Sequence, residues 1–404
     1  MILKNKYLKK YIIKKINKNN INKMFAEVCL FIKKSNLNIF FDYIIPDHLI
    51  SLAQKGMRVI VPFGSKNISR LGYIVDIKDK SYLATKFILE IPDKKPFLNN
   101  ELFCLVKEIL QIPFLSKTSA YTTIIPNGFL VSYKRKILPL QKELIPSDIK
   151  QYLEKKKWFL SIKDIFFKEK KLDKLIQKKI IESHIVIKNF YDEEKKTKKN
   201  EELKSDYMKD FFYSNSKNKI KLNLTKKLEK VFKKINFSIS QTYLVYYNNI
   251  LTKVNFYLKI IEKNYKNQKQ ILILVPELIL IKPLINEIKK HFSFLNISVL
   301  TGFLSKKENY IQNKMIKEQK VSIVIGNRSA IFAPLENLGS IIIDDEHDSS
   351  LIERKFINYD SRELAKIRSI YHKIPIFLSS NTPSLESGRK RGFNIEWLNQ
   401  PYTA

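Results

Sequence analysis

The feature of the sequence that most limits its fold is a series of short apolar runs in the second half of the chain. These runs are nearly continuous in Ile, Leu and Val, and each ends in a polar or turn residue: 271–277, 297–302, 321–327, 340–346 and 374–380. Between them, 282–292 and 361–371 have helical character. This alternation is typical of an α/β fold, a parallel sheet covered by helices on both faces. Such sheets bind ligands at the carboxyl ends of their strands, so the polar residues there are candidate site residues.

The first half of the chain has a different pattern. Short apolar runs separated by turn residues predict a small β-rich barrel or sandwich: 25–32, 40–46, 56–65 and 71–77. Helical stretches with one short strand within 148–190 suit a winged-helix module. We therefore predict a basic extension at 1–23, a β-rich domain at 24–120, a winged-helix module at 121–191, a charged linker at 192–220 and an α/β lobe at 221–404.

The charge of the chain favours a polyanionic partner, but codon bias explains it equally well. Lys and Arg total 74 against 39 Asp and Glu, which gives a net charge of +35. The same sequence is rich in Lys, Asn, Ile, Phe and Tyr and has 9 Gly, as A/T-rich codons would produce. Whatever its origin, this charge attracts phosphate, and salt weakens that attraction.

Cysteine and hydropathy patterns exclude several other classes of protein. Cys29 and Cys104 are the only cysteines, and no C-x-x-C pair exists, so we expect no zinc site. No disulfide framework is expected either, which fits a reducing cytoplasm. No uncharged apolar run reaches about 18 residues, so no membrane span and no membrane partner are predicted.

One strand end carries a dense group of acids. The segment 340–350 reads SIIIDDEHDSS, a buried strand followed by Asp344, Asp345, Glu346 and His347. An Asp at such a position holds Mg²⁺ in nucleoside triphosphatases, and a neighbouring acid positions the attacking water. The alternative is a cluster of acids in a solvated loop.

Other strand ends share a pattern with a known family. The runs are LVPEL at 274–278, IVIGNRSAIFAP at 323–334, IIIDDEHDSSL at 341–351 and SNTPSLES at 380–387. They resemble those of primosomal protein N-prime, the bacterial replication-restart DNA helicase family. The front of the chain matches as well, with AEV at 26–28, FDY at 41–43 and GMRVIVPFG at 56–64, followed by GYIVDI. The resemblance covers about residues 24–390 and implies a RecA-like helicase lobe behind a DNA-binding β domain.

The resemblance also implies partners and roles. Family members are ATP-dependent 3′-to-5′ DNA helicases that use ATP and Mg²⁺. They act at stalled forks and free 3′ ends of DNA, with replication-restart and single-strand-binding proteins as partners. Asp42 would contact the terminal 3′-hydroxyl, and an aromatic side chain could stack on the last base. Tyr43, Pro62, Phe63 and Gly64 would shape the pocket. Without the family, the same residues would be interpreted as a strand-edge turn packed by two aromatics.

The phosphate-binding loop of the family is altered in this sequence. Its pattern G-x-x-x-x-G-K-[ST] aligns with 247–254, where Lys253 is kept but Tyr247 and Thr252 replace the glycines and Val254 replaces the hydroxyl residue. Only glycine readily adopts the positive φ angles that turn the N–H groups of such a loop inward. Val254 cannot ligate a metal.

Two further positions depart from the family. Leu228 stands in place of the adenine-reading Gln, and Asp345 is one methylene shorter than the family's Glu. Asp344, Glu346 and His347 match, with Asp344 as the expected Mg²⁺ ligand. We also expect the zinc motifs and the second helicase lobe of the family to be missing from this chain.

These observations predict a DNA-binding protein of replication restart and primosome assembly with a degraded ATPase. Three alternatives stay open: an ATPase completed by a second polypeptide, a scaffold that binds replication proteins instead of DNA, and the product of a decaying gene. ATP turnover distinguishes the first alternative, and binding to DNA 3′ ends distinguishes the second.

Overall fold

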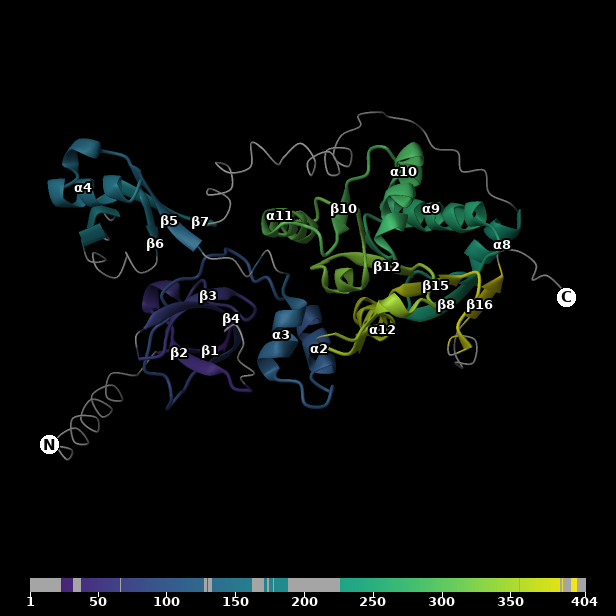
Figure 1. The fold of residues 1–404 in the computed structure, drawn as a ribbon, viewed down its shortest axis with the longest axis horizontal. Helices are drawn as coiled ribbons and strands as arrows, with labels where there is room; N and C mark the ends of the chain where they lie inside the picture. Colours follow the sequence, from purple (N-terminus) through teal and green to yellow (C-terminus); the bar gives the residue numbers. More distant parts are fainter. Residues whose placement is uncertain are drawn as a thin grey trace. The chain divides into compact units, whose positions relative to one another are not determined.

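The computed structural model describes most of the chain (Figure 1). The described residues are 23–31, 38–65, 67–126, 129, 133–161, 171–172, 174–176, 178–187, 226–355, 357–385, 387 and 394–397. The predicted linker at 192–220 and all but the last residue of the predicted basic extension lie outside them. No helix among the described residues is both long and apolar enough to cross a membrane.

The chain forms two compact units. The first consists of Met1–Leu98 and Tyr133–Val186, and the second of Asn99–Ser132 and Ile187–Ala404. Residues 99–120, which the sequence analysis placed in the β-rich domain, cluster with the second unit. The predicted domain boundaries stay a prediction.

A four-stranded antiparallel sheet forms the front of the first unit. Its strands are β1 (Phe25–Leu30), β2 (Phe41–Ile44), β3 (Arg58–Phe63) and β4 (Ile68–Lys78), in the order β2-β1-β4-β3. Alternate side chains such as Ala26, Val28, Val59 and Val61 enter one buried cluster. A short 3₁₀ helix, η1 (Asp47–Leu49), follows β2. The prediction of a β-rich domain at the front of the chain is confirmed.

The rest of the first unit has its own small core. Strands β5 (Tyr133–Pro139), β6 (Phe159–Ser161) and β7 (Ile181–Ile187) form a sheet in the order β6-β5-β7. They accompany η3 (Lys142–Leu144) and helix α4 (Ser147–Lys155), whose Ile149 and Leu153 are buried. The winged-helix module predicted for this region stays a prediction.

A seven-stranded parallel sheet is the centre of the second unit. Its strands are β8 (Gln241–Tyr246), β9 (Gln270–Leu274), β10 (Ile297–Leu300), β11 (Ile323–Gly326), β12 (Leu338–Ile343), β15 (Pro375–Ser380) and β16 (Asn394–Trp397). Their order is β10-β11-β9-β12-β15-β8-β16, and every recorded pair is parallel. The prediction of a RecA-like parallel sheet is confirmed.

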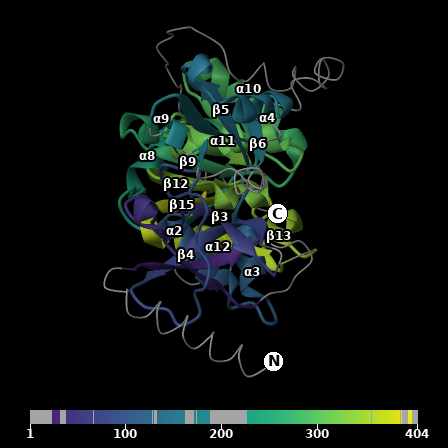
Figure 2. The same cartoon turned by 90° about the vertical axis from the view of Figure 1, so that its left-hand side faces the viewer.

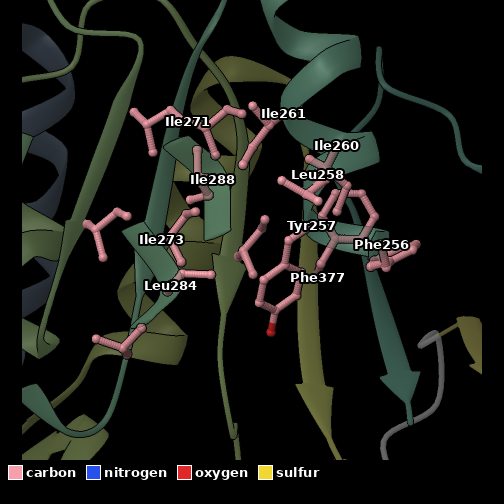
Figure 3. Packing of buried hydrophobic residues seen from close by; sticks show 14 of the residues in the cluster. Phe256, Tyr257, Leu258, Ile260, Ile261, Ile271, Ile273, Leu284, Ile288 and Phe377 are labelled. Atoms are coloured by element: carbon pink, nitrogen blue, oxygen red, sulfur yellow. The ribbon is translucent and has the colours of Figure 1, made fainter. Parts of the chain in front are cut away.

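Helices cover both faces of this sheet (Figure 1, Figure 2). On one face lie α8 (Lys226–Lys234), α9 (Ile250–Lys266) and α10 (Ile281–His291), which share a core with alternate residues of the strands. Figure 3 shows the centre of this core, where Phe256, Tyr257 and Phe377 lie beside the aliphatic side chains. The opposite face is covered by α12 (Ser361–His372), which packs on β12, β15 and α2 (Asn100–Ile109).

The remaining elements of the second unit are short or lie at the sheet's edges. They are α3 (Lys117–Ile124), η5 (Leu278–Leu280), α11 (Lys306–Lys317), η6 (Arg328–Phe332), η7 (Ser349–Leu351), β13 (Ile352–Glu353) and β14 (Tyr359–Asp360). A buried ion pair ties α2 to α12: Arg368 Nε lies 2.5 Å and Nη2 3.0 Å from the Glu101 carboxylate oxygens. Both side chains are at most 1% exposed.

Candidate functional sites

The first candidate site is built around Asp42 on β2. Its backbone is in register with Glu27 on β1, so the two carboxylates are neighbours. Lys78, at the end of β4, lies with Nζ 2.8 Å from Glu27 Oε1 and 3.3 Å from Asp42 Oδ1. The hydroxyl of Ser81 donates a hydrogen bond of 2.6 Å to Asp42 Oδ2. Asp42, Lys78 and Ser81 are called the Asp42 site below; the Asp42 side chain is 11% exposed.

The turn after β3 lies next to the residue that follows Asp42. Tyr43 donates its hydroxyl to the carbonyl oxygen of Pro62 at 3.2 Å, and burial raises the pKa of Tyr43 to about 12. Phe63 packs edge-on against Phe41, with ring centroids 5.1 Å apart. Gly64 adopts φ 70°, which favours glycine, and its carbonyl oxygen accepts a hydrogen bond from Lys86.

The structure thus brings together Tyr43 and the Pro62–Gly64 turn, but Tyr43 is part of the core of the β-rich domain. Its side chain belongs to the buried core, with 3% exposure, so its ring is not available to stack on a base. Lys78, Ser81 and Lys86 were missed by sequence reasoning. Because the chain is so rich in lysine, nothing in the sequence distinguishes Lys78 or Lys86 from the other lysines.

The second candidate site lies at the carboxyl end of β12. Lys253 Nζ lies 2.9 Å and 3.1 Å from the two carboxylate oxygens of Asp344. Tyr257 donates its hydroxyl to Asp344 Oδ1 at 2.7 Å, and Ser379 donates to the same oxygen at 3.2 Å. These four residues are called the Asp344 site below. The side chains of Lys253 and Asp344 are 12% and 5% exposed, so the carboxylate is enclosed by the chain's own donors.

The turn between β8 and α9 explains why Lys253 reaches Asp344. Residues 250–252, which would belong to a phosphate-binding loop, form instead the first turn of α9. Asn249 caps this helix by accepting from the N–H of Leu251 at 2.7 Å. From Tyr247 to Val254, all of them described, no residue has a positive φ angle. The backbone N–H groups are therefore arranged as in an ordinary capped helix and do not form a phosphate cradle.

Two substituted positions meet across this end of the sheet. Tyr247 stands at the position of the first loop glycine and donates its hydroxyl to Asp345 Oδ1 at 2.5 Å. Burial, followed by this hydrogen bond, holds the pKa of Tyr247 well above its usual value. The ammonium of Lys253 lies 4.9 Å from the centroid of the Tyr247 ring, within the range of a cation–π contact. Asp345 itself has φ 44°, in the left-handed region.

Glu346 and His347 face the end of β15. Glu346 is fully buried and accepts hydrogen bonds from the Ser384 N–H at 2.7 Å, the Ser384 hydroxyl at 3.1 Å and the Ser387 hydroxyl at 2.7 Å. His347 Nδ1 lies 2.8 Å from the Ser380 hydroxyl. The acid motif is thereby tied to the SNTPSLES segment, and the Glu346 carboxylate has no access to solvent.

The other positions that depart from the family pattern do not indicate a nucleotide-binding site. Val254 packs against the hydrophobic core, and Leu228 lies within it at 1% exposure, while Thr252 is half-buried. Mg²⁺ prefers several oxygen ligands in octahedral geometry. Here the Asp344 carboxylate is already paired with an ammonium group, and position 254 supplies no hydroxyl. The residues present therefore do not fit Mg²⁺ in this arrangement.

Tyr257 and Ser379 were not among the predicted site residues. Tyr257 follows Lys253 by one helical turn, so both side chains lie on the same face of α9, which is the signal that could have identified it. Ser379 lies near the end of β15, beside β12. Among the predicted residues, the structure gathers Lys253, Tyr247, Asp344 and Asp345, and directs Glu346 and His347 elsewhere.

Comparison with known proteins matches both halves of the chain. Residues 27–126 match the 3′DNA-binding domain of PriA, and residues 244–389 match the DEAD/DEAH box helicase family. The chain is 29% identical over 438 residues to replication restart protein PriA of Bacillus subtilis, covering 90% of this chain and 54% of the relative.

Two other curated relatives carry the same name. The chain is 29% identical over 364 residues to PriA of Buchnera aphidicola subsp. Schizaphis graminum, covering 86% of this chain and 47% of that protein. It is 38% identical over 135 residues to PriA of Haemophilus influenzae, covering 33% and 18%. The chain spans about half the length of the curated relatives that match most of it.

Proposed function

The chain belongs to the family of the replication restart protein PriA, and from this premise we propose that it binds DNA by holding a free 3′ end at the Asp42 site. Stalled replication forks are the proposed source of such ends. Replication-restart and single-strand-binding proteins are the proposed protein partners. The observation that carries the proposal is the placement of Asp42, near the surface but fixed by its neighbours.

The chemistry of the Asp42 site suits a hydroxyl ligand. One carboxylate oxygen of Asp42 already accepts from the Ser81 hydroxyl, so the site tolerates an alcohol donor at hydrogen-bond distance. A terminal 3′-hydroxyl can donate in the same way. A 3′-phosphate carries negative charge and would be repelled by Asp42 and the neighbouring Glu27. Lys78 and Lys86 offset part of the charge of the DNA backbone, so binding should weaken as salt rises.

The test compares oligonucleotides that end in a 3′-hydroxyl or a 3′-phosphate, with affinity measured by fluorescence anisotropy. We expect the parent chain to prefer the 3′-hydroxyl by about tenfold, because a hydrogen bond to a charged group contributes about 1.5 kcal/mol or more. Asp42→Ala should lose this preference. Asp47→Ala removes an exposed carboxylate five positions away and should keep it. Equal affinity of the parent chain for both ends would overturn the assignment of Asp42.

For the second unit, we propose that ATP is not hydrolysed at a rate that supports unwinding, although ATP and Mg²⁺ are the family's cofactors. Three departures support this: the first turn of α9 occupies the loop positions, Tyr247 binds Asp345, and Lys253 binds Asp344. Loss of a single preorganised electrostatic contact costs about 10²–10³ in rate. Here several contacts differ from the family pattern at once.

DNA-stimulated phosphate release by the purified chain tests this second proposal. The parent and Lys253→Ala should both remain at background. Turnover in the parent that disappears in Lys253→Ala would show that the altered loop is a working site. Such a result would favour the alternative of an active ATPase, including one completed by a second polypeptide.

A further inference from the structure

The segment that follows β4 has one hydroxyl turned inward among exposed neighbours. Residues 79–85 have no regular secondary structure, and all of them except Ser81 and Ala84 are exposed. Ser81 is half-buried because its side chain points to the Asp42 site, where its hydroxyl donates to Asp42 Oδ2 at 2.6 Å. This hydroxyl therefore ties an otherwise exposed segment to the carboxylate.

The Ser81 hydroxyl also organises the turn that it belongs to. Its oxygen accepts from the N–H of Leu83 at 3.2 Å and from the N–H of Ala84 at 3.3 Å, while its single proton is donated to Asp42. The side chains of Tyr82 and Leu83 are 93% and 81% exposed, so little apolar contact would be lost if the turn moved. The hydrogen bond to Asp42 is the interaction that such a movement would have to break.

The two donors that reach Asp42 differ in how easily each can be replaced. Lys78 Nζ lies 3.3 Å from Asp42 Oδ1 and 2.8 Å from Glu27 Oε1, so it neutralises two carboxylates that are in register on neighbouring strands. Removing Lys78 would leave these like charges side by side. Ser81 is neutral, and another hydroxyl in its place would change neither the charge nor the number of hydrogen bonds at Oδ2. Oδ2 is therefore the oxygen that can exchange its donor.

We propose that Ser81 is a specificity-determining residue of the Asp42 site, because its hydroxyl occupies the place that a terminal 3′-hydroxyl of DNA takes. On binding, the 3′-hydroxyl donates a hydrogen bond to Asp42 Oδ2, Ser81 leaves this oxygen, and the turn that carries Tyr82 and Leu83 moves with it. The inference rests on the proposed binding of 3′ ends, but it concerns what the free chain does with the same carboxylate.

This exchange has two consequences for the site. When no DNA end is bound, Asp42 keeps a donor on Oδ2, so its carboxylate is not left without a partner in a place where it is 11% exposed. When a 3′-hydroxyl binds, it has to replace a hydrogen bond that the chain already makes, so Ser81 lowers the affinity for the end that the site accepts. An ionised 3′-phosphate repels Asp42 and does not replace Ser81.

The test measures the affinity of the full chain for oligonucleotides that end in a 3′-hydroxyl or a 3′-phosphate. Ser81→Ala removes the internal donor, so we expect this variant to bind the 3′-hydroxyl about tenfold more tightly than the parent does, the contribution of one hydrogen bond to a charged group. Its affinity for the 3′-phosphate should not change. The preference for the 3′-hydroxyl should therefore rise from about tenfold in the parent to about a hundredfold.

Three further variants separate the hydroxyl from the shape of the side chain. Ser81→Thr keeps a hydroxyl and should retain the parent's affinities. Ser81→Val has the shape of that threonine without its hydroxyl and should behave as Ser81→Ala does. Thr85→Ala removes an exposed hydroxyl of the same segment and should leave both affinities unchanged.

The outcomes distinguish this inference from the proposed function. A parent that prefers the 3′-hydroxyl, with no gain or with weaker binding in Ser81→Ala and Ser81→Val, would overturn the inference and leave the assignment of Asp42 standing. Weaker binding would show that Ser81 arranges the site for DNA instead of competing with it. Equal affinity of the parent for both ends would overturn the proposed function and the role of Ser81 together.

Discussion

Both candidate sites contain an aspartate paired with a lysine, but the two pairs differ in what surrounds them. At the Asp42 site, Lys78 is 34% exposed and is shared between Asp42 and Glu27. At the Asp344 site, Lys253 is 12% exposed, and Tyr257 and Ser379 donate to the same carboxylate. The first carboxylate is close to solvent and can exchange a partner for a ligand. The second carboxylate has its hydrogen bonds and its charge partner supplied by the protein, as is usual for a buried structural ion pair.

This comparison can be tested because each unit contains one tryptophan. Trp158 belongs to the first unit and Trp397 to the second. In a Trp397→Phe background the fluorescence follows the first unit, and in a Trp158→Phe background it follows the second. Urea unfolding in these two backgrounds then gives a free energy of unfolding for each unit.

The largest expected effect is at the Asp344 site. Lys253→Met removes the ammonium and leaves Asp344 buried without its charge partner. We expect the free energy of unfolding of the second unit to fall by about 3–5 kcal/mol, as is usual when one partner of a buried pair is removed. The double variant Lys253→Met with Asp344→Asn removes both charges and should recover most of the loss. A change of under about 0.5 kcal/mol in the single variant would mean that the pair is not structural.

An intermediate effect is expected at Glu101. Its ion pair with Arg368 is buried but lies outside both candidate sites, so it shows what burial alone contributes. Glu101→Gln keeps an oxygen acceptor for Arg368 but removes the charge, so we expect a loss of about 2 kcal/mol. Burial alone would raise the pKa of Glu101, but the charge of Arg368 and the hydrogen bonds of His372 and Arg368 outweigh it and lower the pKa.

The pH dependence of this pair has a definite sign. Because the folded pKa of Glu101 is lowered, its contribution is complete above the pKa of an unfolded Glu, about 4.3. It is lost as the pH falls further, through the folded pKa. Urea unfolding of the second unit across this acid range should therefore be less pH-dependent in Glu101→Gln. This explanation would be contradicted if the free energy of unfolding fell equally steeply with decreasing pH in the parent and the variant.

The smallest effect is expected at Lys78. Exposed ion pairs contribute about 0.2–1 kcal/mol, so Lys78→Met should change the free energy of unfolding of the first unit by less than about 1 kcal/mol. The comparison between the two sites is therefore measured by how much more unfolding free energy is lost in Lys253→Met than in Lys78→Met. Similar losses in both would remove the distinction between an open and a closed site.

Much of the second unit could be predicted from its sequence because strands buried on both sides are continuous apolar runs. The five predicted runs became β9, β10, β11, β12 and β15. The edge strand β16 and strand β8, which also carries tyrosines, were not predicted. The acids after β12 could also be predicted, because they directly follow a continuous apolar run and can be identified from the sequence alone.

The partners of those acids could not be predicted, because they come from distant parts of the chain. Tyr247 and Asp345 are 98 positions apart, and each looked like a separate departure from the family until the structure showed them hydrogen-bonded. Ser81 on the first unit gave no signal either, since a serine beside an exposed loop is common. Pairing across a fold depends on topology, which short-range patterns do not contain.

The pairing of Glu101 with Arg368 has a consequence for how the protein is made. These residues are 267 positions apart, so at about 5–20 residues per second the ribosome needs roughly 15–50 s to deliver the partner of Glu101. During that time α2 has been synthesised, but the helix on which it packs has not. Its buried face, with Leu102, Leu105 and Val106, would be exposed on the nascent chain. Chaperones that shield apolar segments would therefore have this helix as a target until α12 has been synthesised.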